Sequence, residues 1–273
     1  MLASYHNHSS WSDGQASIAD MLDGAIRSGV AEFGISDHWT MHPEGQTPEW
    51  SIPLHRLDAY TARVRELQEG TSARLAFRLG LEVDWFPSME HIIRRRLESA
   101  GFDYLIGSVH YVGDFLIDTS AEAWEPLDED ERREIATNYW DCLRSMAASN
   151  LFDIVGHLDL YKKFAIAPDT STTPEAMAAL DAIAASGMVV EVNTAGWHKP
   201  CAEAYPSLSL LQECRGRDIP TTINADAHRP EHVIRDFDRA AALLREAGYT
   251  EVVRFGAKRE RRVEKIEDAL QSG

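Results

Sequence analysis

The chain has 273 residues, 44% of them hydrophobic and 26% charged, and its formal net charge is −17. A chain of this length buries a core of full size, so neither disulfides nor metal ions are needed for folding. Nucleic acids and anionic membrane surfaces would repel the negative charge, which argues against both as partners. One domain is expected, because no linker-like or repetitive segment occurs and α/β barrels reach this size as a single unit.

The cysteines and the amino-terminal residues indicate a compartment. Cys142, Cys201 and Cys214 are odd in number and form no CxxC pair, which favours free thiols and a reducing environment. The first ten residues, MLASYHNHSS, lack the basic and apolar regions of a signal peptide, and no apolar run is long enough to span a membrane. The sequence therefore predicts a cytoplasmic protein, and it carries no signal for an oligomeric state.

Segments typical of strands and of helices alternate along the chain. Strands are expected at residues 2–5, 32–36, 75–83, 103–109, 152–155, 188–192, 220–225 and 251–255. Helices are expected at residues 18–29, 54–69, 88–100, 128–149, 174–186, 207–217 and 231–247. Ser17 and Asp20 have the spacing of a capping box, and Pro174 suits the first turn of its helix. Residues 42–53 are expected to form a loop, and residues 258–273 a surface helix or tail.

This alternation predicts parallel strands joined by right-handed crossovers, which either a barrel or a doubly wound sheet would satisfy. Histidines and carboxylates gather near the carboxyl ends of these strands, and in a barrel those ends meet at one face. In an extended chain, residues spaced i, i+2 point to the same side, so His6 and His8 lie on one side of their strand. Asp226 and His228 have the same spacing. The whole set is His6, His8, His38, Glu82, His110, His157, Asp226 and His228.

A single histidine at a strand end is more often structural than a ligand, but six of them with two acids indicate a metal centre. Imidazole and carboxylate without thiolate suit Zn, Mn or Fe. The motifs that carry these residues resemble the polymerase-and-histidinol-phosphatase (PHP) superfamily, and within it the histidinol-phosphatases of histidine biosynthesis. The matching stretches, in family order over nearly the whole chain, are residues 5–9 (YHNHS), 12–14 (SDG), 35–39 (ISDHW), 80–84 (GLEVD), 107–111 (GSVHY), 156–159 (GHLD), 191–196 (EVNTAG), 205–207 (YPS) and 226–228 (DAH).

The resemblance implies a distorted (β/α)7 barrel that holds two or three divalent ions. Carried over by motif, the ligand sets are His6, His8, Glu82 and Asp226 for one ion, Glu82, His110 and His157 for a second, and Asp13, His38 and His228 for a third. Asp13 stands where some relatives have His. The implied reaction is hydrolysis of L-histidinol phosphate, with Asp13 and Glu82 as catalytic residues. Metal coordination lowers the pKa of water to roughly 7, so a bridging hydroxide would attack phosphorus while the ions neutralise phosphoryl charge.

The residues expected to contact the substrate depart in part from the family pattern. His42, on the loop after the second strand, is the candidate acid for the leaving group or a phosphate ligand. Where these phosphatases usually carry Arg, this chain has Lys162 and Lys163, and His198 with Lys199 replaces a frequent Arg-Lys pair. A lysine supplies charge without the bidentate fork of arginine, so these departures bear on the substrate more than on the reaction.

Three alternatives remain open. A PHP phosphoesterase could act on nucleotides or on another small phosphate ester. An amidohydrolase-type barrel, which cleaves C–N bonds, often begins with HxH but commonly bridges its ions with a carboxylated lysine, whereas the corresponding acid here is Glu82. A non-catalytic metal-binding module would take up ions without turnover. A nucleic-acid exonuclease is disfavoured by the net charge and by the lack of a basic stripe with interleaved aromatic residues.

Overall fold

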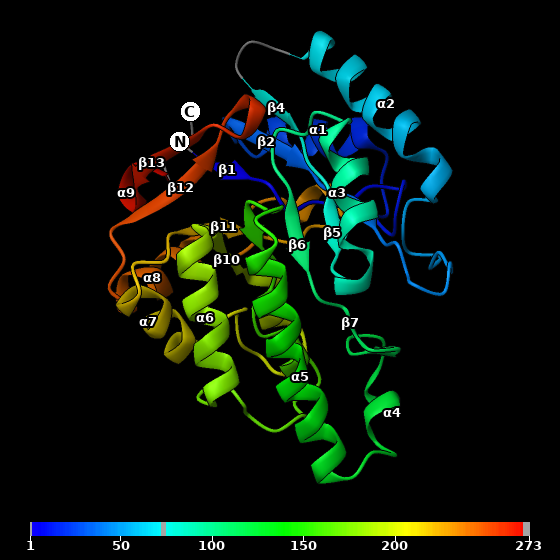
Figure 1. The fold of residues 1–273 in the computed structure, drawn as a ribbon. Coiled ribbons are helices and arrows are strands. Elements are labelled where there is room, and N and C mark those ends of the chain that lie inside the picture. The colour runs from blue at the N-terminus through cyan, green and yellow to red at the C-terminus, as the bar shows by residue number, and fades with distance from the viewer. Residues whose placement is uncertain (1, 72–74, 270–273) are drawn as a thin grey trace.

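A computed structural model describes residues 2–71 and 75–269 of the chain. Its strands form a ring of parallel pairs, and helices surround the ring (Figure 1). In order around the ring, the strands are β1 (Ala3–Ser4), β2 (Glu32–Ile35) continued by β3 (His38–Trp39), β4 (Ala76–Leu79) continued by β5 (Glu82–Asp84), β6 (Ile106–Ser108), β9 (Ile154–Val155), β10 (Val189–Asn193) and β11 (Thr221–Asn224).

The ring closes through the residues that follow β1. Asn7 forms a parallel bridge with Ala227, and the backbone N–H of His8 donates to the Ala227 carbonyl at 2.8 Å. On the other side of this segment, the N–H of Ser36 donates to the Asn7 carbonyl at 2.8 Å. The fold is therefore the expected single-domain α/β barrel rather than a doubly wound sheet. It is distorted because the second and third strands each break into two pieces, so the strand expected at 75–83 is interrupted after Leu79.

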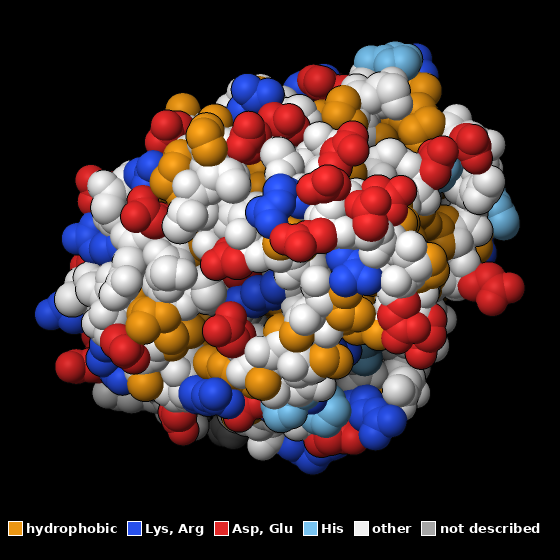
Figure 2. Space-filling model, turned by 90° about the horizontal axis from the view of Figure 1, so that it is seen from below, with side chains coloured by type: hydrophobic (Ala, Val, Ile, Leu, Met, Phe, Trp, Pro, Cys, Tyr) orange, Lys and Arg blue, Asp and Glu red, His pale blue; other side chains and the backbone are white. Residues whose placement is uncertain are grey.

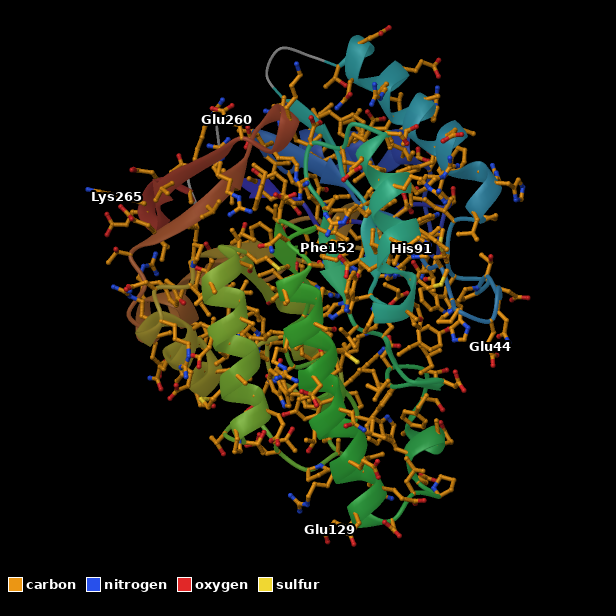
Figure 3. All side chains as sticks on the ribbon, in the orientation of Figure 1. Glu44, His91, Glu129, Phe152, Glu260 and Lys265 are labelled. Carbon is orange, nitrogen blue, oxygen red and sulfur yellow. The ribbon has the colours of Figure 1, made fainter. Side chains whose placement is uncertain are left out.

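Helices follow most strands, close to their expected positions. They are α1 (Ile18–Arg27), α2 (Leu57–Gly70), α3 (Glu90–Glu98), α4 (Ala121–Trp124), α5 (Glu129–Ala148), α6 (Pro174–Ser186), α7 (Leu208–Gly216) and α8 (Phe237–Glu246). The predicted capping box of α1 is present between Ser17 and Asp20, and Thr173 caps α6 one residue before Pro174. The helices α5 and α6 pack side by side (Figure 1), and Glu129 marks the far tip of α5 in Figure 3.

Short turns and a small hairpin occupy the loops. The 3-10 turns are η1 (Leu54–Arg56), η2 (Pro87–Met89), η3 (Leu160–Lys162), η4 (Thr194–His198), η5 (Pro230–His232) and η6 (Ala257–Arg259), and the hairpin pairs β7 (Tyr111–Val112) with β8 (Phe115–Leu116). No helix in the described part of the chain is long and apolar enough to cross a membrane. All three cysteines are unpaired, as expected. On the face drawn in Figure 2, acidic and basic side chains are interspersed without a continuous basic stripe.

The tail predicted as a surface helix is mainly a strand. Residues 261–265 form β13 (Arg261–Lys265), which pairs antiparallel with β12 (Glu251–Phe255), and the short helix α9 (Ile266–Ala269) follows. The last four residues of the predicted tail, 270–273, lie outside the described part of the chain. Arginines of this hairpin reach acids at the amino ends of barrel strands. Arg254 lies 3.0 Å from Glu32, and Arg259 lies 2.7 Å from Asp153. A run of charged residues shows no hydrophobic period, so these distant partners, rather than local preference, decide its conformation.

The hairpin closes the amino-terminal end of the barrel. The Tyr5 ring packs edge-on against Tyr104 and Phe255, with ring centroids 5.4 Å apart in both pairs. The Tyr5 hydroxyl donates to Glu32 at 2.7 Å and accepts from the Phe255 N–H at 2.8 Å. The Tyr104 ring fits only because Gly80 has no side chain, since an added Cβ there would lie 2.1 Å from it. This packed end leaves the opposite, carboxyl-terminal end of the strands for the polar residues.

We expect Gly80→Ala to lower the free energy of unfolding by about 1–3 kcal/mol, because its methyl group overpacks against the buried Tyr104 ring. Gly216→Ala, at the end of α7, is the matched control. No described atom lies within 4 Å of its added Cβ, so the free energy of unfolding should stay constant or rise slightly. Urea denaturation of both variants measures the difference, and equal stabilities would contradict the close packing at Gly80.

Candidate metal centre and cleft

The side chains predicted as metal ligands meet at the carboxyl ends of the barrel strands. Among the described residues, they form overlapping groups in which the ligand atoms all lie within 4.8 Å of one another. These groups are His8, Asp13, His38 and His228; His6, Glu82 and His157; His6, His8 and Asp226; and His38, Glu82 and His110. Residues from position 6 to position 228 thus share one site, which could hold several metal ions.

Glu82 lies at the centre of these groups and is 1% exposed. Parallel pairing of β5 with β3 places it opposite His38, whose Nδ1 is 2.8 Å from Glu82 Oε2. The same oxygen lies 3.0 Å from His6 Nε2. The second oxygen, Oε1, lies 3.0 Å from His157 Nε2 and accepts a hydrogen bond from Ser108 Oγ at 2.6 Å. One carboxylate therefore faces imidazoles from several strands, which is the position that a ligand shared by two ions requires.

Several buried polar atoms at this centre form no hydrogen bond of good geometry with the described residues, although some lie within ion-pair distance of one another. Within the described residues, no hydrogen bond reaches His6 Nε2, either ring nitrogen of His8, Glu82 Oε2 or His157 Nδ1. Leaving buried polar groups unpaired costs free energy, so such groups call for a ligand. Imidazole nitrogens and carboxylate oxygens are suitable ligands for Zn, Mn and Fe. The donor set therefore fits divalent metal ions.

The group that contains Asp13 is the most open one. Asp13 Oδ2 lies 3.1 Å from His228 Nε2, and Oδ1 lies 3.7 Å from His38 Nε2. The His8 ring stacks between these two imidazoles, with centroids 4.2 Å from His38 and 4.4 Å from His228. The carboxylate that stands where some relatives have histidine thus still offers an oxygen to the group, which also includes His8 besides the three residues expected from the sequence.

Two carboxylates that orient the imidazoles were missed by the sequence analysis. Glu191 on β10 is buried and accepts from His6 Nδ1 at 2.9 Å, and Asp84 on β5 accepts from His110 Nδ1 at 2.7 Å. A carboxylate only accepts, so each Nδ1 carries the hydrogen and each Nε2 is left to bind an ion. Two features of the sequence could have revealed them. Glu191 is the single acid in the apolar run 188–192, and Asp84 has i, i+2 spacing from Glu82.

The buried carboxylates strongly shift the imidazole pKa values of the ion-free protein. Burial alone would lower the pKa of His38, but attraction by Glu82 and Asp13 outweighs it and raises that pKa to about 10. For His110, attraction by Asp84 outweighs burial and raises the pKa to about 9. His8 behaves in the opposite way, because burial and repulsion by neighbouring imidazoles lower its pKa to about 4. Metal ions must therefore displace protons from some of these side chains.

The groups open into a cleft of about 510 Å³. Six of the predicted ligands line it, together with the acid Asp118 and the cations Lys163, Lys199, Arg229 and Arg235. A neighbouring hollow of about 230 Å³ shares Asp118 and several ligands and adds the Trp50 ring. Cavities of this size suit small molecules.

The predicted substrate-binding residues divide into two sets. Lys163 and Lys199 line the cleft, although the Lys163 amine already lies 3.1 Å from Asp118. Lys162 is held away from it by Asp159 at 2.8 Å and Glu203 at 2.9 Å. Lys162 is therefore an ion-pairing residue in this structure. The i, i+3 spacing of Asp159 and Lys162 is visible in the sequence, whereas the sequence carried no signal for Glu203.

Two predicted histidines also lie outside the cleft lining among the described residues. His198 is half-exposed and pairs with Asp236 at 2.6 Å. His42 is buried against the rings of Phe86 and Tyr111, with centroids 5.1 and 5.2 Å away. Glu44, two residues further along the same loop, points outward from the molecule (Figure 3). The geometry thus gives no support to His42 as the acid for the leaving group or to His198 as a phosphate ligand.

Comparisons with known proteins agree with this geometry. The sequence profile of the PHP domain matches residues 4–195. The chain belongs to the PHP family. It is 37% identical over 228 residues to a probable histidinol-phosphatase of Deinococcus radiodurans, covering 82% of this chain and 85% of the relative. It is 25% identical over 260 residues to the histidinol-phosphatase of Lactococcus lactis, covering 92% of this chain and 93% of the relative.

A solved structure confirms the PHP barrel. The crystal structure of the histidinol phosphate phosphatase from Lactococcus lactis, complexed with Zn, L-histidinol and phosphate, matches this chain with a TM-score of 0.80. The sequence identity is 22%, and the match covers 96% of this chain and 98% of that chain. The fold and the family expected from the sequence motifs are both confirmed.

We expect the Zn²⁺ affinity of the PHP centre to rise with pH between about 7 and 10, because each ion displaces protons from imidazoles with raised pKa values, such as those of His38 and His110. Isothermal titration in buffers of different ionisation enthalpy counts the protons released. The chelator-treated protein should show the opposite trend and lose stability as the pH rises from 6.5, since a raised folded pKa stabilises only while the group is protonated. Zn²⁺ binding without proton release would contradict this electrostatic account.

We expect Glu191→Gln to weaken Zn²⁺ binding by about 10–100-fold, because the amide cannot replace the carboxylate that orients His6 and also accepts the His157 N–H at 2.8 Å. Glu213→Gln is the matched control, since Glu213 pairs only with surface Arg217 among the described residues. Competition titration with a chromophoric chelator measures both affinities. Equal affinities of the two variants would exclude an orienting role for Glu191.

Proposed function

We propose that this PHP protein is a metal-dependent phosphomonoesterase of histidine biosynthesis, which hydrolyses L-histidinol phosphate to L-histidinol and phosphate. The convergence of nine imidazole and carboxylate side chains at the base of one cleft carries the proposal. The relative that is 37% identical over most of both chains, a probable histidinol-phosphatase, supports the same substrate. The cytoplasmic location expected from the cysteine pattern is part of this proposal.

In the reaction, the side chains of this protein would hold the metal ions and position the phosphate ester. When bound, divalent Zn, Mn or Fe would supply a water of lowered pKa and positive charge for the phosphoryl oxygens. Glu82, His6, His8 and Asp226 would hold one ion, Glu82, His110 and His157 a second, and Asp13, His38 and His228 a third. Glu191 and Asp84 fix the ring orientations of His6 and His110 through hydrogen bonds.

The hollow beside the metal groups favours a substrate with a cationic leaving group. Asp118 lines both the cleft and this hollow, and the Trp50 ring lies 5.6 Å from the His110 ring at its edge. Burial would raise the pKa of Asp118, but attraction by His110 and Lys163 outweighs it, so the group is a carboxylate at neutral pH. A carboxylate beside an indole ring suits an ammonium or imidazole group. Histidinol phosphate carries an ammonium group and a free imidazole, whereas the base and sugar of a nucleotide carry no cationic group at neutral pH.

The alternative reactions find less support. Among the described residues, the carboxylate between the groups is Glu82, which takes the place that a carboxylated lysine would have in an amidohydrolase-type bridge. A module that only stores metal does not need the cleft beside the ligands. Another small phosphate ester remains the second candidate for the substrate. The metal groups by themselves would recognise the phosphate and not the alcohol to which it is esterified.

We expect the protein reconstituted with Mn²⁺ or Zn²⁺ to hydrolyse L-histidinol phosphate with a kcat/KM at least tenfold above that for nucleoside monophosphates, since about 1.4 kcal/mol of extra binding suffices for that ratio. Release of inorganic phosphate measures the rates. Faster turnover of a nucleoside monophosphate would overturn the substrate, and the absence of any turnover would overturn the reaction.

We expect Asp118→Asn to lower kcat/KM for L-histidinol phosphate by about 10-fold or more, because it removes the carboxylate that, besides its ion pair with Lys163, would attract the cationic leaving group. The rate with p-nitrophenyl phosphate, which has no cationic group, is the matched control and should change little. An equal loss with both esters would show that Asp118 supports the site as a whole rather than selecting the alcohol.

A further inference from the structure

We propose that Arg235, assisted by Arg229, binds the phosphoryl group of the substrate, so that the anion-binding wall of the cleft comes from the segment after the last barrel strand. This inference rests on the proposed function only in requiring a phosphate ester as the substrate. Arg235 and Arg229 would take the phosphate-binding role that the sequence suggested for residues such as Lys162 and His198.

Arg235 forms no ion pair with a carboxylate among the described residues, although Asp226 and Asp236 lie near enough to attract its charge. Its side chain lines the cleft, and its Nε is buried without a hydrogen-bond partner among the described residues. The guanidinium makes one long contact with a neighbouring side chain, 3.5 Å between Nη1 and His232 Nδ1. A buried guanidinium donor without a partner is costly, so an anionic ligand that enters the cleft would complete its hydrogen bonding.

Three of the other cations at or near the cleft are already engaged. The Lys162 amine is held by Asp159 and Glu203, and the Lys163 amine by Asp118. His198 pairs with Asp236 outside the cleft lining. Lys199 lines the cleft without an ion pair among the described residues, but a lysine offers a point charge and not a fork. Arg229 and Arg235 are the cleft residues that can bind a phosphate with paired N–H donors.

The backbone fixes these arginines relative to the metal groups. Arg229 directly follows the predicted ligand His228, whose carbonyl accepts from the Gln15 N–H at 2.8 Å. The Arg235 N–H donates to the His232 carbonyl at 2.9 Å, and the Arg235 carbonyl accepts from Thr194 Oγ1 at 2.8 Å. A guanidinium attached to so constrained a turn is held on the same wall as the ligands. It is therefore placed to bind the phosphoryl oxygens of an ester held in the cleft beside the metal groups.

The test compares Arg235→Met and Arg235→Lys with Arg239→Gln in the Zn²⁺-loaded protein. Arg239 on α8 is the matched control, because it lies outside the cleft lining. Its guanidinium stacks on the Trp197 ring, 4.1 Å from the ring centroid. Isothermal titration measures the affinity for inorganic phosphate, and elemental analysis measures the zinc content. We expect Arg235→Met to weaken phosphate binding roughly 10–100-fold and Arg235→Lys to weaken it less, at unchanged zinc content. Arg239→Gln should bind phosphate like the wild type.

The rates with L-histidinol phosphate and p-nitrophenyl phosphate separate this inference from the proposed function. Arg235→Met should lower kcat/KM equally for both esters, because both share the phosphoryl group. Unchanged phosphate affinity in Arg235→Met would overturn the inference, as would a wild-type protein that binds zinc but no phosphate. If Arg235→Met does not fold, an unchanged affinity in Arg235→Lys overturns it. Hydrolysis of p-nitrophenyl phosphate alone, with the arginine effect intact, would overturn only the histidinol phosphate assignment.

Discussion

The structure depends on the burial of the Glu82 carboxylate among imidazoles. A buried charge is tolerated only when other charges and hydrogen bonds compensate it, and here His6, His38 and His157 surround both oxygens. In the ion-free protein, the raised pKa values of His6 and His38 favour protonated rings that provide the compensation, and in the loaded protein metal ions would do so. The same carboxylate therefore couples the stability of the barrel to the occupancy of the centre. It also ties together strands that are distant in the sequence.

The two ends of the barrel divide the tasks of stability and chemistry. At the amino-terminal end, rings of Tyr5, Tyr104 and Phe255 fill the interior under the β12–β13 hairpin. At the opposite end, backbone strain is accepted, since His157 and Asp226 have positive φ angles of 22° and 50°. Such conformations are unfavourable for residues other than glycine and persist only where the surrounding structure enforces them. The well-packed end thus supports a ligand arrangement that local preferences alone would not form.

Much of the site could be predicted because it follows from the geometry of strands. The two-residue period places His6 beside His8, and parallel pairing gathers strand ends at one face, so no long-range contact had to be known. Where the structure departs from the sequence expectation, distant partners are involved. Arg259 and Arg261 of the tail bind Asp153, Lys162 binds Glu203 besides its neighbour Asp159, and His198 binds Asp236. The distant acids are brought close only by the tertiary structure. The helix expected from residue 231 begins at Phe237, which places Arg235 in a turn that faces the cleft.

The net charge of −17 and the affinity for an anion that we propose are compatible, because the two act over different distances. Charges on the outer surface are screened beyond about 8 Å at physiological ionic strength, whereas groups inside a cleft interact through a medium of lower polarity. Most cations of this chain lie in ion pairs and cancel locally. Arg229, Arg235 and Lys199 have no carboxylate partner within the described residues, so their field adds to that of bound metal ions. An anion that reaches the cleft therefore meets a positive wall, although the molecule as a whole is acidic.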